Sequence, residues 1–106
     1  MEKVYNKLVR DKIPQIIKAN GEEPITRSLN SDEYKKELYK KLKEEVAEFL
    51  EDENIEELAD ILEVIHGILN SSQISFEDLE KIRQAKREKR GGFEGRVFLE
   101  MVIDNE

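Results

Sequence analysis

The sequence predicts an all-α fold, a bundle of about four principal helices around a central antiparallel helical hairpin. Apolar residues recur at helical spacing along most of the chain. Helix-capping signals precede several of these segments, and a short turn separates the two central ones. A short connection makes its two helices antiparallel neighbours. Short extended segments are expected at both ends.

The first helix is expected to follow a mixed opening segment. Asp11 is predicted as its N-cap, with Pro14 in the first turn, where the missing N–H does no harm. The helix should end at Asn20, next to a glycine. After a polar connector, Asn30 or Ser31 is expected to cap the second helix, and Glu33 stands three residues after Asn30, as a capping box requires.

The central hairpin is predicted from residues 34–51 and 55–70, with a turn at residues 52–54. A fourth helix should start at Ser75, since an acid again follows three residues later, and should stop at the glycine pair 91–92. The remaining tail is expected to form a short strand or an arm that packs on a neighbour.

Bulk properties narrow the class of protein. The chain has 106 residues, the length of one domain. Its 25 acidic and 18 basic residues give a net charge of −7, which argues against binding to polymeric nucleic acid. It has no cysteine and no apolar run of membrane-spanning length, so we expect a cytoplasmic protein that does not bind membranes. A chain this short buries a limited core, so a homodimer or homotetramer is expected.

Four acidic residues, the four-acid cluster, are predicted to meet at the seam of the hairpin: Glu45, Glu48, Glu57 and Asp60. Glu48 and Glu57 are equidistant from the junction of residues 52 and 53, and so are Glu45 and Asp60. On a helical wheel, which advances about 100° per residue, one acid of each facing pair lies inside the apolar arc of its helix and the other borders it. Such carboxylates repel one another unless cations neutralise them, and oxygen ligands suit Mg²⁺.

Two simpler explanations stay open. Acids at this spacing are common on a solvated helix face, and some of these carboxylates could form structural salt bridges with Lys40 or Lys41. Two pairs mirrored about a turn, both intruding on an apolar stripe, favour a metal site over a solvated face. Glu44 points farther towards solvent and is the weaker ligand candidate.

Four stretches of the chain carry a resemblance to a known family: Glu44-Glu45-Val46-Ala47-Glu48, Glu57-Leu58-Ala59-Asp60, the opening Tyr5–Pro14, and Lys89–Phe93. The first two match the signature E-E-x-x-E followed by E-x-x-D. With the others they resemble the all-α nucleoside triphosphate pyrophosphohydrolase superfamily, which includes MazG-like proteins, dimeric dUTPases and phosphoribosyl-ATP pyrophosphohydrolase. The spacer of residues 49–56 is shorter than in many members, which leaves less room for insertions that cover a substrate.

The resemblance implies a reaction and a cofactor. Glu45, Glu48, Glu57 and Asp60 would hold Mg²⁺, with Mn²⁺ as a substitute ion. Water would attack a nucleoside triphosphate and break its α–β bond, giving monophosphate and pyrophosphate. Glu48 is the candidate general base, because it lies at the wetter edge of the stripe, and Glu45 is the second candidate catalytic carboxylate.

A triphosphate substrate also needs cations from the protein. Lys86, Lys89 and Arg90 form the densest basic run, and the glycines after them could approach a phosphate closely. The alternative is that these bases complement the negative end of a helix dipole. Lys7, Arg10 and Lys12 are a second candidate phosphate-binding group. For Asp11, a capped helix start with an ion pair to Arg10 is the simpler explanation.

The expected function is therefore Mg²⁺-dependent nucleotide pyrophosphohydrolysis, in the sense of removing non-standard or surplus nucleotides. The enzymatic alternative is hydrolysis of phosphoribosyl-ATP in histidine biosynthesis, which keeps the chemistry and changes the substrate. An alternative of another class is a non-catalytic nucleotide-sensing or helical interaction module. The motifs of metal chemistry do not select the nucleotide.

Overall fold

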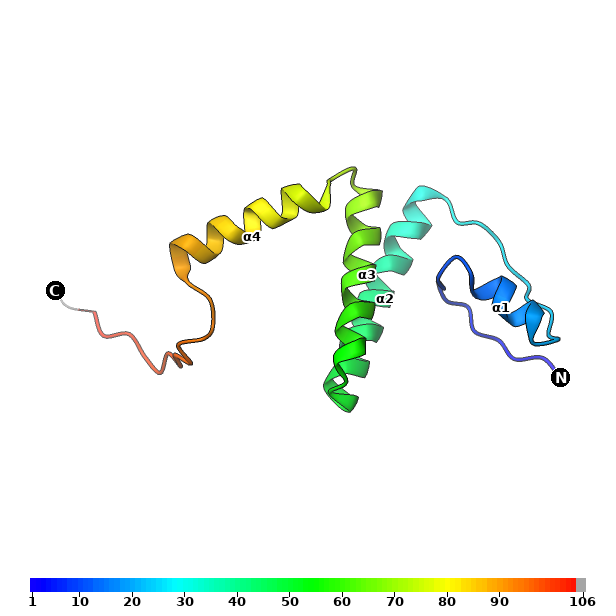
Figure 1. Cartoon of the computed structure of the whole chain (residues 1–106), viewed down its shortest axis with the longest axis horizontal. Coiled ribbons are helices and arrows are strands. Elements are labelled where there is room, and N and C mark those ends of the chain that lie inside the picture. Colours follow the sequence, from blue (N-terminus) through cyan, green and yellow to red (C-terminus); the bar gives the residue numbers. More distant parts are fainter. Residues whose placement is uncertain (105–106) are drawn as a thin grey trace. The chain divides into compact units, whose positions relative to one another are not determined.

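The computed structural model describes residues 1–104, and this part of the chain contains helices and no strand. The helices are α1 (Ile13–Ala19), α2 (Ser31–Asp52), α3 (Ile55–Ser71) and α4 (Phe76–Arg90) (Figure 1). The prediction of an all-α fold with about four principal helices is therefore confirmed. Within residues 1–104, no helix is long and apolar enough to cross a membrane.

The chain divides into two compact units, with the boundary just before α4. The first unit is Met1–Ile74, which holds α1, α2, α3 and the four-acid cluster. The second begins at Ser75 and holds α4 and the C-terminal tail. The organisation as a single domain stays a prediction.

The start of α2 is fixed by the predicted capping box. The Asn30 side chain accepts a hydrogen bond from the Glu33 N–H at 2.9 Å, and the Glu33 carboxylate accepts one from the Asn30 N–H at 3.3 Å. Two backbone N–H groups that the helix itself leaves without partners are thereby satisfied. The sequence signal and the structure agree here because a capping box depends on local geometry alone.

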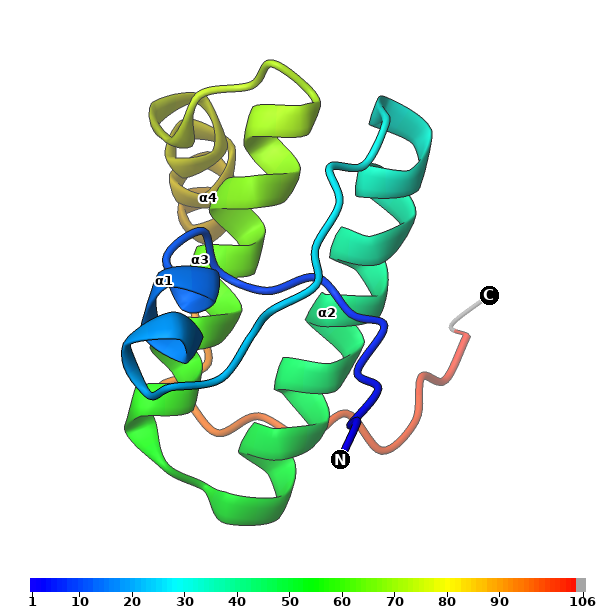
Figure 2. The ribbon, with the colours of Figure 1, turned by 90° about the vertical axis from the view of Figure 1, so that its right-hand side faces the viewer.

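The turn between α2 and α3 is one residue shorter than the predicted turn at residues 52–54, because α2 continues through Asp52. Glu53 takes the left-handed conformation (φ 53°) and its N–H donates to the Phe49 carbonyl at 2.7 Å, which closes α2. Asn54 then caps α3 by accepting from the Glu56 N–H at 3.0 Å. Only these two residues separate the helices, so α2 and α3 run antiparallel and side by side (Figure 2).

The seam of the hairpin is lined by a small apolar core. Leu38 of α2 is 4% exposed, and Val64 and Leu69 of α3 are also buried. Gly67 makes room for this contact, because a Cβ there would lie 2.8 Å from Leu38 Cδ2. The absence of a side chain at this position therefore lets α3 approach α2 closely.

The buried faces of α2 and α3 are narrower than their apolar residues suggest. Leu50, Leu58 and Leu62 lie at helical spacing with the other apolar residues of their helices, yet they are exposed. Glu45 is buried, in agreement with its predicted place inside the apolar arc of α2. The Lys41 ammonium group lies against the Glu45 carboxylate and offsets the cost of burying that charge.

Of the predicted caps of α1 and α4, one is correct and one is wrong. Ser75 caps α4 as predicted, accepting from the Asp78 N–H at 3.1 Å. The predicted cap at Asp11 is wrong, because Lys12 holds the N-cap position of α1 and makes no side-chain cap bond. The tail after Gly91 forms no strand as far as residue 104, so the expectation of an arm remains.

Candidate metal centre

Glu45 is the buried member of the four-acid cluster, at 8% exposure. Its Oε1 lies 3.4 Å from Lys41 Nζ, and the same ammonium group lies 3.5 Å from Glu44 Oε2. The salt-bridge explanation therefore holds for Lys41, whereas Lys40 pairs with Glu37 at 3.1 Å and takes no part. One lysine cannot neutralise the whole cluster.

Glu48 is exposed one turn beyond Glu45 on α2. Repulsion from the Glu45 carboxylate is the main cause that raises the pKa of Glu48 above its ordinary value. Desolvation, a hydrogen bond with Glu45, and the charges of Glu44 and Glu57 add to the shift. Because Glu57 lies on α3, acids of both helices interact here.

Glu57 carries the polar atom that most needs a partner. Within the described residues, its Oε1 is the buried side-chain oxygen without a hydrogen bond. Desolvation raises the pKa of Glu57, and the charges of Asp52, Asp60 and Glu45 raise it further, against a lowering hydrogen bond at Asn54. Burying a carboxylate oxygen without a hydrogen-bond donor costs free energy, and a bound cation or a proton would offset that cost.

Asp60 pairs with Arg10, a cation from the N-terminal segment of the same unit. Arg10 Nη2 donates to Asp60 Oδ1 at 2.7 Å, across 50 positions of sequence. Lys7 Nζ of the same N-terminal segment lies 3.5 Å from Glu44 Oε1. These two contacts attach the N-terminal segment (residues 1–12) to both helices of the hairpin.

The donor chemistry of the cluster fits a hard divalent cation. Every candidate ligand is a carboxylate oxygen, which Mg²⁺ and Mn²⁺ prefer. The unpartnered Glu57 oxygen and the raised pKa of Glu48 both mark a shortage of positive charge. In residues 1–104, no three acidic or histidine side chains are grouped closely enough to hold a metal ion. Metal binding would therefore require these side chains to draw together.

The predicted phosphate-binding residues are distributed over both units. Arg10 belongs to the first unit and pairs with Asp60, and Lys12 is exposed at the start of α1. Lys86, Lys89 and Arg90 are exposed on α4 in the second unit. Lys89 and Arg90 lie in the last turn of α4, where they also complement the helix dipole.

Sequence reasoning missed the pairing of Arg10 with Asp60 and of Lys7 with Glu44. It associated Arg10 with a phosphate or with its own neighbour. No local pattern signals a contact between residues 50 positions apart. The excess of acids over bases at the seam was the signal that could have predicted these pairs, because clustered carboxylates are stabilised by basic side chains from other parts of the chain.

Comparisons with known proteins give a partial match. No family model matches the chain, and no solved structure matches it. A stretch of 41 residues is 56% identical to an uncharacterized protein of Mycolicibacterium smegmatis. The stretch covers 39% of this chain and 42% of that relative, so the chain spans less than half the relative's length. The function is therefore proposed from the site.

The repulsion at Glu48 predicts an unusual pH dependence of stability without metal. A carboxyl whose pKa is higher in the folded than in the unfolded protein contributes stability below its ordinary value of 4.5, and that contribution is lost as pH rises through the folded pKa. In EDTA, Glu48→Gln should therefore melt a few degrees above wild type at neutral pH. The difference in melting temperature should vanish below pH 4.5, the ordinary pKa of a glutamate.

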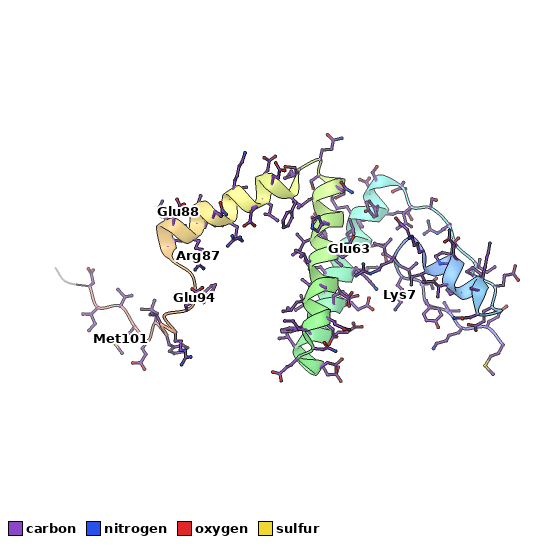
Figure 3. The ribbon with its side chains drawn as sticks, viewed as in Figure 1. Lys7, Glu63, Arg87, Glu88, Glu94 and Met101 are labelled. Carbon is purple, nitrogen blue, oxygen red and sulfur yellow. The ribbon has the colours of Figure 1, made fainter. Side chains whose placement is uncertain are left out.

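Thermal denaturation from about pH 4 to 8 measures this difference. Glu63→Gln is the matched control, because Glu63 is an exposed acid on α3 (Figure 3). The control should show no such pH-dependent gain. A Glu48→Gln variant that is less stable than wild type at neutral pH would contradict the repulsive cluster.

Proposed function

We propose that the protein is a Mg²⁺-dependent nucleoside triphosphate pyrophosphohydrolase that cleaves the α–β bond, giving nucleoside monophosphate and pyrophosphate. The observation that carries the proposal is the unpartnered buried oxygen of Glu57 among mutually repelling carboxylates of both hairpin helices. The resemblance of these acids to the E-E-x-x-E and E-x-x-D signature supports the same reaction.

The four-acid cluster would hold the ion, with Glu45 the most firmly placed ligand because it is buried against Lys41. Mg²⁺ bound there would supply charge neutralisation for the phosphate oxygens and would lower the pKa of a bound water. The carboxylates of α2 and α3 would orient the reacting groups, because they stand on two packed helices.

Glu48 is the proposed general base. Its exposed carboxylate can reach solvent and can accept a proton from a water molecule beside it. The proton of the attacking water would pass to the Glu48 carboxylate as the phosphorus–oxygen bond forms. Glu45, one turn away on α2, is the second proposed catalytic carboxylate.

The cations proposed to bind the phosphates are Arg10, Lys12, Lys86, Lys89 and Arg90. A guanidinium presents two parallel N–H groups to a phosphate, and an ammonium adds a point charge. Either would offset the negative charge that a triphosphate brings to an acidic protein. Their assignment rests on the resemblance and on their charge.

A pyrophosphate-release screen tests the function directly. The substrates are canonical, deoxy and modified nucleoside triphosphates together with phosphoribosyl-ATP, each with and without Mg²⁺. We expect Mg²⁺-dependent release of pyrophosphate from a triphosphate. Turnover of phosphoribosyl-ATP alone would point to histidine biosynthesis instead. No turnover with Mg²⁺ binding intact would favour the non-catalytic sensing module.

The second unit supports a proposal about assembly. None of its described residues is buried, and Phe93, Val97 and Phe98 are almost fully exposed. A chain segment below about 40 residues rarely folds alone without disulfides or a partner, and the protein has no cysteine. We therefore propose a cytoplasmic homodimer or homotetramer that shares this apolar surface.

Sedimentation velocity tests the assembly. The mass obtained from sedimentation should be two or four times the 12.5 kDa mass of one chain. Val97→Asp combined with Phe98→Asp should shift it towards the monomer, because a charge in an apolar interface is costly. Lys81→Asp is a control that adds the same side chain at an exposed site on α4. A wild-type protein that sediments as a monomer at micromolar concentration would contradict the proposal.

A further inference from the structure

The N-terminal segment places two cations at the edge of the four-acid cluster. Arg10 reaches Asp60 on α3 at 2.7 Å, and Lys7 reaches Glu44 on α2 at 3.5 Å. A single segment thus contacts the acids of both hairpin helices. Such a segment can hold the acidic seam together while no other cation is present.

Arg10 occupies an acid that the proposed metal centre needs. Its 2.7 Å contact with Asp60 Oδ1 has the length of a charge-assisted hydrogen bond. The guanidinium takes one acceptor site of the carboxylate and leaves the others free, so its competition with a metal ion at Asp60 is mainly electrostatic. The positive charge of Arg10 weakens the attraction of the cluster for a second cation.

The contact is nevertheless easy to exchange. The Arg10 side chain is 55% exposed and that of Asp60 is 41% exposed. Solvent and salt screen ion pairs at such exposure, so their net contribution to stability is small. A divalent ion that gains several carboxylate ligands together can therefore displace the guanidinium. The freed guanidinium then has the planar pair of donors that a phosphate group accepts.

We propose that Arg10 is an exchangeable counter-ion, which pairs with Asp60 in the metal-free protein and transfers to the phosphate groups of the substrate when a divalent ion takes Asp60. This inference rests on the proposed function. It assigns Arg10 two successive partners, first Asp60 and then a phosphate group. Replacing Arg10 should therefore strengthen metal binding and weaken phosphate binding.

Two binding titrations of Arg10→Gln test these effects. The first uses Mn²⁺ alone, followed by its electron paramagnetic resonance signal, and the variant should bind Mn²⁺ about 2- to 10-fold more tightly. The second uses inorganic tripolyphosphate at saturating Mn²⁺, which avoids any dependence on the base. The variant should bind it at least about 10-fold more weakly.

Two further variants keep the test specific. Arg27→Gln removes an exposed arginine that pairs with Glu33 at 3.2 Å, outside the four-acid cluster, and both affinities should match those of wild type. Arg10→Lys keeps the charge without the planar fork, so its Mn²⁺ affinity should stay near wild type and tripolyphosphate binding should recover in part.

The outcomes separate this inference from the proposed function. Mn²⁺ affinity that is unchanged or weaker in Arg10→Gln would overturn the exchange, whatever the enzyme turns over. A parallel loss of both affinities would show a merely structural role and would overturn it as well. An absence of turnover in the nucleotide screen, with opposite changes in the two titrations, would instead reject the hydrolase and leave the exchange standing.

Discussion

Replacing Glu45 by glutamine is expected to lower pyrophosphate release at least about 100-fold, because even the loss of a residue that supports a metal ligand typically costs 10- to 100-fold. The change removes the buried charge of the cluster, so it weakens the proposed metal centre. Initial rates at saturating Mg²⁺, on the best substrate of the screen, measure the effect.

Asp60→Asn provides an independent test on the other helix. Its side chain is 41% exposed, so the substitution should not disturb the fold, which circular dichroism can verify. We expect a similar loss of rate. Glu63→Gln, the exposed acid on α3, should keep wild-type activity. Hydrolysis that survives both Glu45→Gln and Asp60→Asn would reject the four-acid cluster as the metal centre.

Mg²⁺ is expected to raise the melting temperature by roughly 10–20 °C when its concentration is about one hundred times its Kd. Binding to the folded state alone adds about 2.7 kcal/mol under that condition. In a domain of this size, about 1 kcal/mol corresponds to roughly 4–8 °C. Differential scanning fluorimetry at constant protein concentration and matched ionic strength measures the shift.

Glu57→Gln is the decisive variant for this melting experiment. It replaces the carboxylate whose buried oxygen has no partner, so the response to Mg²⁺ should fall to less than half of that in wild type. In the absence of Mg²⁺ the variant should be as stable as wild type or more stable, because one repelling charge is gone. An equal response to NaCl and MgCl₂ at the same ionic strength would indicate a solvated acidic face instead.

The parts of the fold that depend on local chemistry could be predicted from the sequence. The capping box at Asn30 and the cap at Ser75 involve residues three positions apart. The short turn at residues 53–54 required the antiparallel hairpin, and the hairpin brought the acids of the two helices into range of one another's charge. These features follow from bonding rules that act over a few residues.

The remaining features depend on contacts that sequence periodicity does not encode. Leu50 lies at helical spacing with the apolar residues of α2, yet it is 70% exposed, so periodicity overstates the width of the buried face. The ion pair with Lys41 makes the burial of Glu45 tolerable, and hydropathy alone does not count such pairs. The contact of Arg10 with Asp60 is set by the path of the chain between them, which no local signal specifies.

The two-residue turn of the hairpin has a consequence for how the protein folds. Contacts within α2 and α3 are close in sequence, so they can form early, whereas the N-terminal segment must close a long loop before Arg10 meets Asp60. The carboxylates are therefore brought together before their counter-ion arrives. Repulsion among them should raise the barrier to folding, and a divalent ion present during refolding should accelerate that step rather than only slow unfolding.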